Sequence, residues 1–338
     1  MEGPEFSVDA LVYEGEITIC GFADRHIFFP PYFIEMGHTI PSNQPPDTIK
    51  SLLDVFCRGV KALGISNGAA KGDIKLSSKG PMIGEIAARL SGGFMSGWTY
   101  PYSSGVLPTK GAIEIALGKK PGGLEPEWDW VCAERAFISI PGKVCSISGI
   151  EKAKIMPLVK DVFPGIRPGV SVIFPENNVS KCGSIISAAA SREDAVNSAE
   201  NAARSILIRL ETSNEATNAF LASEPGLSSF PPDAFTLGAP LISALSALPQ
   251  TIAQKADKQL FPLFHISPFP EFTESGLKDY MGRSVQECLD AVRAITGFEL
   301  PIRSQNRAPL GRSFWQAFIR GGYQGAVYYL DSLGCGDG

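Results

Sequence analysis

The fold is decided by residues 72–93, which read GDIKLSSKGPMIGEIAARLSGG. Strand patterns on both sides of the turn signal at residues 77–80 predict an antiparallel hairpin. Asp73 lies on the first of these strands and Glu85 on the second. A tight connection is expected to bring the two carboxylates side by side on one face of the hairpin.

This pair of acids indicates a cation site, because two adjacent carboxylates that stay ionised need a positive charge between them. Oxygen ligands without a nearby His or Cys favour Mg²⁺ or Mn²⁺ over zinc, with nucleotide phosphates and water completing the shell. Arg89 follows Glu85 by four residues, where its guanidinium is placed to clamp a phosphate or carboxylate. Ser91, Gly92 and Gly93 then offer backbone N–H groups to an anion. The pattern favours equally the alternative interpretation, in which these residues form an ordinary acidic hairpin with a solvated arginine.

Working outward, the first forty residues alternate apolar and polar side chains, a pattern typical of strands. Residues 6–13 and 17–22 flank a turn at Glu14-Gly15 and are predicted to pair as a hairpin. After a proline-broken apolar run, residues 34–40 are expected to form an edge strand. An amphipathic helix is predicted over residues 47–61.

Further strand patterns occur at residues 131–140, 143–148, 170–174 and 183–189. A long helix is then expected from its cap at Ser191 to Leu210. From Thr212 the chain becomes rich in Pro, Ser and Ala, with helical patterns at 285–295 and 313–330, whose aromatic side chains are typical of a core or an interface. The composition therefore predicts two domains, 1–211 and 212–338.

Composition excludes several classes of protein. The chain has 338 residues and a net charge of −5, with no concentrated basic patch for nucleic acid. It has no apolar run long enough to span a membrane and no basic, apolar leader at its start. Seven cysteines without a CxxC pair suggest reduced thiols rather than disulfides or zinc. These features predict a cytoplasmic protein without a membrane or nucleic-acid partner.

Four segments together resemble a known superfamily: EGPEFSVD (2–9), FIEMGH (33–38), GDIK (72–75) and EIAARLSGG (85–93). They resemble the C-terminal half of an ATP-grasp domain, most closely in its carboxylate–amine ligases, the L-amino acid ligase and carbamoyl-phosphate-synthase-like group. The resemblance covers about residues 1–210. It implies an α+β fold, an antiparallel sheet with flanking helices, here followed by a smaller, mainly helical region.

The resemblance also implies roles for individual residues. In that superfamily the acid of the first strand and the Glu of the second hold Mg²⁺, which points to Asp73 and Glu85. The arginine four residues later stabilises an acyl phosphate or the substrate carboxylate, which points to Arg89. Many relatives carry Asn two residues after the second acid; Ala87 stands there in this chain, so the resemblance leaves open whether the site holds one metal or two.

Three more residues are candidates for the nucleotide cleft. The resemblance implies that Glu5 and Glu35 line it, and a solvated strand face is the alternative for each. His38 follows at a loop edge and is a candidate for contact with a phosphate or substrate, although a single histidine is more often structural.

The expected function is an ATP- and Mg²⁺-dependent ligase. ATP phosphorylates a carboxylate, and an amine, or a thiol, displaces phosphate from the acyl phosphate. The resemblance implies an earlier half with the phosphate-binding Lys and Gly-rich loop, which we expect from a partner chain or a homo-oligomer because it does not precede Met1. The alternative is a non-catalytic or split subunit that binds a partner chain. A Mg²⁺-dependent phosphohydrolase would need a water-activating base, which the sequence does not indicate.

Overall fold

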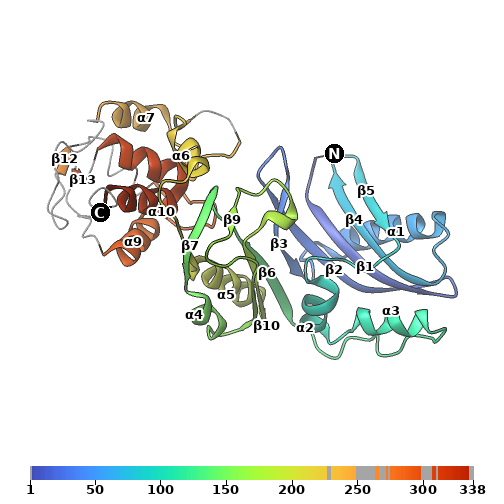
Figure 1. Ribbon diagram of the computed structural model, residues 1–338. Helices are drawn as coiled ribbons and strands as arrows, with labels where there is room; N and C mark the ends of the chain where they lie inside the picture. Colours follow the sequence, from blue (N-terminus) through green and yellow to red (C-terminus); the bar gives the residue numbers. More distant parts are fainter. Residues whose placement is uncertain are drawn as a thin grey trace.

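The computed structural model describes residues 2–226, 230–248, 263–265, 272, 275–297, 307–309 and 311–334. The alternating N-terminal pattern forms the first strands of an eight-stranded sheet, ordered β5-β4-β1-β2-β3-β6-β10-β8 (Figure 1). Every neighbouring pair in it is antiparallel. The strands are β1 (Glu5–Tyr13), β2 (Glu16–Phe28), β3 (Ile34–Ile40), β4 (Gly68–Ser77), β5 (Gly80–Ala87), β6 (Val131–Phe137), β8 (Val159–Pro164) and β10 (Gly183–Ala189).

One face of this sheet is covered by two helices, α1 (Pro46–Ala62) and α5 (Arg192–Ser205). The apolar residues of β1 and β4 pack on α1, with Phe6, Val8, Leu52, Phe56, Val60 and Ile74 fully buried. Gly72 is required at this contact, because a Cβ there would lie 2.5 Å from the Phe56 ring. The expected amphipathic helix is thus confirmed, and it turns the polar residues of β1 and β4 to the other face.

Part of that second face is covered by a short π-helix, η1 (Met95–Thr99), and by α2 (Tyr100–Ser104) and α3 (Pro108–Ala116). Tyr100 lies against the backbone of β2 at Gly21, where a Cβ would overlap its ring at 2.1 Å. Met95 and Tyr100 form a buried cluster with Cys132 and Ile186. The rest of this face, towards β4 and β5, carries charged side chains.

Two expectations about secondary structure are wrong. Residues 34–40 are not an edge strand: β3 lies between β2 and β6, and all seven residues are buried. The prolines before it fall in the connecting turn, so they remove no hydrogen bond from the strand. The helix from Ser191 ends at Ser205 instead of Leu210, because Leu207–Leu210 forms β11, with Ile208 and Leu210 buried in a core.

A smaller sheet, ordered β11-β7-β9, lies beyond β6 and β10. Its strands are β7 (Gly142–Ser148), β9 (Ser171–Val172) and β11 (Leu207–Leu210). Two short helices, α4 (Ile150–Lys154) and η2 (Asn178–Ser180), occur in the same part of the sequence. Apolar residues of β7, β11 and α5 share one core with Phe137 and Tyr328. Through this shared core, the smaller sheet links the large sheet to the C-terminal helices.

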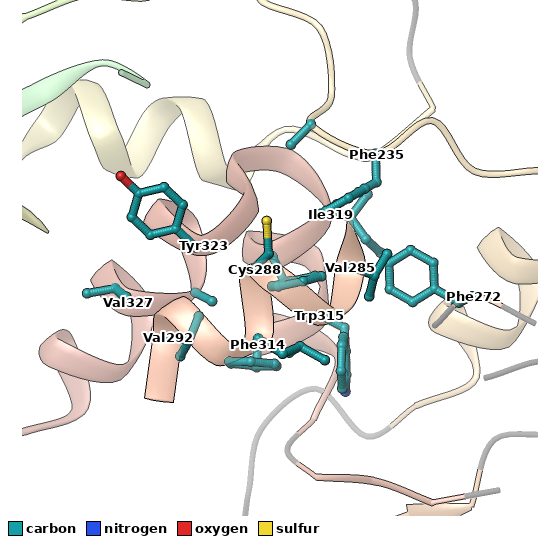
Figure 2. Close-up of a cluster of buried hydrophobic side chains, with 14 of the residues drawn as sticks. Phe235, Phe272, Val285, Cys288, Val292, Phe314, Trp315, Ile319, Tyr323 and Val327 are labelled. Atoms are coloured by element: carbon teal, nitrogen blue, oxygen red, sulfur yellow. The ribbon is translucent and has the colours of Figure 1, made fainter. Parts of the chain in front are cut away.

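The C-terminal region is mainly helical and lies at the end of the molecule opposite β4, β5 and α1 (Figure 1). Its elements are α6 (Glu215–Ala222), α7 (Ala239–Ser246), β12 (Leu263–His265), α9 (Val285–Thr296), β13 (Arg307–Pro309) and α10 (Arg312–Gly334). Aromatic residues of α10, including Phe314 and Trp315, pack with Val285 and Cys288 of α9 (Figure 2). The expected aromatic core is therefore confirmed. A domain boundary at residue 212 stays a prediction.

No helix among the described residues is long and apolar enough to cross a membrane.

Candidate functional site

A row of charged side chains crosses the large sheet on the face opposite α1. Strand register sets this row: Glu5 of β1 lies opposite Lys75 of β4 on one side and Arg25 of β2 on the other. Arg25 in turn lies opposite His38 of β3, and His38 opposite Glu134 of β6. Directly paired residues share a face of the sheet, so strands far apart in sequence contribute to one polar surface.

Asp73 and Glu85 stand at one end of this row. They are register partners across β4 and β5, so their carboxylates lie side by side, as the hairpin predicts. Lys71 lies between them: its ammonium contacts Asp73 and is 3.5 Å from a carboxylate oxygen of Glu85. The two acids therefore already share a cation supplied by the chain itself.

The donor chemistry of this pair suits Mg²⁺ or Mn²⁺. Both acids offer hard oxygen ligands, and half of the Glu85 side chain is exposed, at 52%. No group of three or more His, Cys, Asp or Glu side chains in the described part of the chain is arranged to hold a metal ion. Two protein ligands fit an ion that takes its other ligands from phosphates and water. The role of Asp73 and Glu85 as metal ligands stays a prediction.

Arg25 joins three of the acids in the row. Its guanidinium contacts Glu5, lies 2.5 Å from Glu35 and lies 3.0 Å from Asp73. Burial favours the neutral form of Arg25, but the three carboxylates outweigh it and raise the pKa of the guanidinium above its ordinary value. Sequence reasoning missed both Arg25 and Lys71. The available signal was their place on strands next to the predicted acids.

Glu35 and His38 lie deeper, under the π-helix. His38 is fully buried, with Nε2 2.9 Å from the Thr99 hydroxyl and Nδ1 3.5 Å from Glu134 and 3.8 Å from Glu35. Burial lowers the pKa of His38, yet Glu134 and Glu35 outweigh it and raise the pKa above its usual value. The Glu35 pKa falls to about 2, because His38 and Arg25 outweigh the effect of burial.

The predicted anion loop is held from below by Asp9. The Ser91 amide donates to Asp9 at 3.0 Å, and the hydroxyls of Ser91 and Ser96 donate at 2.6 Å and 2.5 Å. Burial raises the pKa of Asp9, and these three hydrogen bonds oppose that shift. Gly93 continues the loop over the row, where a Cβ would lie 3.7 Å from Glu35. The loop therefore overhangs the charged face, with the Ser91 amide already engaged.

Arg89 lies at the open edge of the site. Its side chain is 55% exposed, and its guanidinium is 3.6 Å from Glu85 and donates to the Leu90 carbonyl at 3.0 Å. The structure thus brings Arg89, Glu85 and Asp73 together, and Arg25 joins Asp73 to Glu5. His38 alone of the predicted residues is sealed from solvent.

A separate cavity lies among the C-terminal helices. It measures about 670 Å³ and is lined by residues of α6, α7 and α10, including Arg312, Gln316 and Tyr329. None of the predicted site residues borders it. Within the charged row, Glu85 and Arg89 are about half exposed, whereas the side chains of Arg25, Glu5, Glu35, Asp73 and Lys71 are 9–17% exposed.

Comparison with known proteins agrees with this architecture. Residues 136–211 match the family described as L-amino acid ligase C-terminal domain 2. Carnosine synthase 1 of Gallus gallus is 31% identical over 120 residues, which cover 35% of this chain and 13% of that protein. The uncharacterized protein y4rH of Sinorhizobium fredii is 24% identical over 206 residues, or 61% of this chain and 42% of that protein.

Two solved structures share the fold. The L-amino acid ligase from Bacillus licheniformis has a TM-score of 0.57 at 21% identity, covering 63% of this chain and 53% of that one. The phosphoribosylglycinamide synthetase from Anaerococcus prevotii has a TM-score of 0.56 at 18% identity, covering 62% of this chain and 54% of that one. This chain therefore spans about half or less of the length of these relatives. The antiparallel sheet of this chain thus shares the fold of these two structures, and its residues 136–211 match the L-amino acid ligase C-terminal domain 2 model.

Proposed function

We propose that the charged row binds ATP with Mg²⁺ or Mn²⁺, and that the chain takes part in joining a carboxylate to an amine or a thiol. The observation that carries this proposal is the register pairing of Asp73 with Glu85, which lies 3.6 Å from the guanidinium of Arg89. The family match and the two solved ligase structures support the same class of reaction.

The reaction would proceed in two steps. A carboxylate oxygen of the substrate attacks the γ-phosphorus of ATP, the bond to the β–γ bridging oxygen breaks, and ADP leaves. The amine then attacks the acyl carbon, phosphate departs, and the amine loses a proton. Both steps depend on positioning and charge neutralisation, so the chain needs no covalent nucleophile.

Each predicted residue has a place in this scheme. Asp73 and Glu85 would hold the metal, which neutralises phosphate charge when bound. Arg89 is 55% exposed, so its planar fork is free to pair with an acyl phosphate. In the loop, Ser91 is engaged with Asp9, so we assign the amides of Gly92 and Gly93 to the anion.

The deeper residues would act on the shape and charge of the cleft. Glu5 and Glu35 line it and fix Arg25 between them. His38 is fully buried, so it would act through Glu35 rather than touch a phosphate itself.

Calorimetric titration of the full chain with ATP and Mg²⁺ tests the binding site. Asp73→Asn and Glu85→Gln are expected to abolish metal-dependent nucleotide binding. Glu211→Gln is the matched control, because Glu211 is also a half-exposed acid paired with a lysine, Lys143 at 2.9 Å. Equal binding by all three variants would refute the site.

ADP release with a panel of carboxylic acids and amines then tests the reaction. Release that depends on both an acid and an amine supports the ligase. Metal-dependent binding without release favours the alternative, a nucleotide-binding subunit that acts with a partner chain.

A further inference from the structure

Lys71 occupies an unusual position among the cations of the charged row. It stands on β4 two residues before Asp73, so both side chains project from the same face. Its ammonium contacts Asp73 and lies 3.5 Å from Glu85, and only 9% of its side chain is exposed. A lysine this buried is held by its partners rather than by water.

The neighbouring cations do not bridge the two acids in this way. Arg25 reaches Asp73 at 3.0 Å from the β2 side, and Arg89 approaches Glu85 at 3.6 Å from the exposed side. Each acid therefore keeps a second partner if Lys71 leaves. Among the described residues, only Lys71 is paired with both Asp73 and Glu85.

Apart from the more deeply buried His38 and Glu134, the ion pairs of the row are balanced in charge. Four carboxylates, Glu5, Glu35, Asp73 and Glu85, pair with four cations, Arg25, Lys71, Lys75 and Arg89. A free divalent cation placed between the acids would add uncompensated positive charge. ATP with one Mg²⁺ brings a net charge of about −2, so its phosphates supply a new partner for a displaced cation.

We propose that Lys71 is a tethered counter-ion that occupies the place between Asp73 and Glu85 until a metal–nucleotide complex arrives. The metal then takes the place of the ammonium, and the long, flexible lysine side chain moves to a phosphate of the incoming nucleotide. Lys71 thereby disfavours binding of the metal alone and couples metal binding to nucleotide binding. This inference rests on the proposed function, because it assumes the same metal site.

The test is a titration of the full chain with Mn²⁺, followed by electron paramagnetic resonance of the free ion, with and without a non-hydrolysable ATP analogue. Lys71→Met is expected to bind Mn²⁺ alone at least about tenfold more tightly than wild type, since a competing charge has been removed. With the analogue present, the variant is expected to bind the nucleotide about tenfold more weakly, since a phosphate partner is lost.

Lys75→Met is the matched control. Lys75 lies on the same strand and face and pairs with Glu5 at 3.2 Å, away from the bridge between the two acids. It is expected to raise the affinity for Mn²⁺ alone less than Lys71→Met does, because Lys75 pairs with Glu5 and not with the two acids of the metal site. Thermal melting of each variant checks folding, and Lys71→Gln replaces Lys71→Met if the latter does not fold.

The outcomes separate the two proposals. If wild type binds the metal–nucleotide complex but neither Lys71 variant binds Mn²⁺ alone more tightly, the counter-ion role is refuted and the proposed function stands. If the Lys71 variants bind Mn²⁺ more tightly but no form binds the nucleotide analogue, the coupling to nucleotide and the proposed function both fail. If Lys75→Met raised the affinity for Mn²⁺ alone as much as the Lys71 variants do, the effect would be one of general charge. That result would overturn the assignment to Lys71.

Discussion

Replacing Arg25 with methionine tests whether the charged row is also a structural unit. Arg25 is 11% exposed and pairs with Glu5, Glu35 and Asp73, which are themselves 10–17% exposed. Methionine keeps much of the apolar length of the side chain and removes the charge. Three partly buried carboxylates would then lose their shared partner.

The size of the effect follows from these distances. A contact of about 3 Å has a Coulomb attraction of about 5 kcal/mol at an effective dielectric constant of about 20, and desolvation offsets much of it. Breaking a buried ion pair by removing one partner costs about 3–5 kcal/mol. We therefore expect Arg25→Met to lower the free energy of unfolding by about 4 kcal/mol and the Tm by about 10 °C.

Urea unfolding followed by circular dichroism measures the first quantity, and differential scanning calorimetry measures the second. Arg89→Met is the control, because Arg89 is 55% exposed and its ion pair with Glu85 spans 3.6 Å. An exposed ion pair of this kind contributes less than about 1 kcal/mol to the free energy of unfolding. A loss below about 1 kcal/mol for Arg25→Met, or equal losses for both variants, would refute the view that Arg25 organises the row.

Three further predictions follow from the site. Arg89→Lys keeps the charge but not the planar fork, so ADP release by the active protein should fall at least about tenfold while the Tm changes little; unchanged release would remove Arg89 from the site. The pKa of His38 is raised in the folded state, so its contribution to stability is complete below about pH 6.5 and is lost as the pH rises through the folded pKa. His38→Gln, which leaves Glu35 and Glu134 in place, should therefore flatten the decline in unfolding free energy above that pH, and an unaltered pH profile would contradict the reasoning. Asp9→Ala should cost about 2–3 kcal/mol and speed hydrogen exchange at Ser91, because it leaves hydrogen-bond donors without their acceptor; unchanged exchange there would show that the loop is held otherwise.

Local pattern was sufficient for much of the architecture. The alternation in β1, the amphipathic pattern of α1 and the Ser191 cap of α5 each report a period or a cap that a few neighbouring residues define. The segments around Asp73 and Glu85 likewise carry enough of the superfamily pattern to predict an ATP-grasp sheet.

Only the tertiary structure decided which strands pair with partners distant in the sequence. β3 is central because β6, from about ninety residues later, pairs with its free edge, and no local signal encodes that partner. Leu207–Leu210 leaves the helical pattern because β7 offers a ladder and a core for Ile208 and Leu210. Burial against a distant segment outweighs the local preference in both cases.

The site itself depends on bulges in the sheet, and two of them set the partners of Asp73 and Glu5. Regular pairing from the turn, where Ser77 faces Gly80, would put Gly84 opposite Asp73 and turn Glu85 to the α1 side; a bulge after Asp73 brings Glu85 opposite instead. Glycine suits that bulge, because a Cβ on Gly84 would lie 3.2 Å from the Asp73 carbonyl oxygen.

The second bulge lies between β1 and β2. Regular pairing from Tyr13 and Glu16 would place Asp24 opposite Glu5, and an extra residue near Asp9 puts Arg25 there. The acids of the site were visible in the sequence because each stands within a local motif. Arg25, which partners three of them, was not visible, because a one-residue change in register decides which side chain reaches the face, and register is a property of the paired strands.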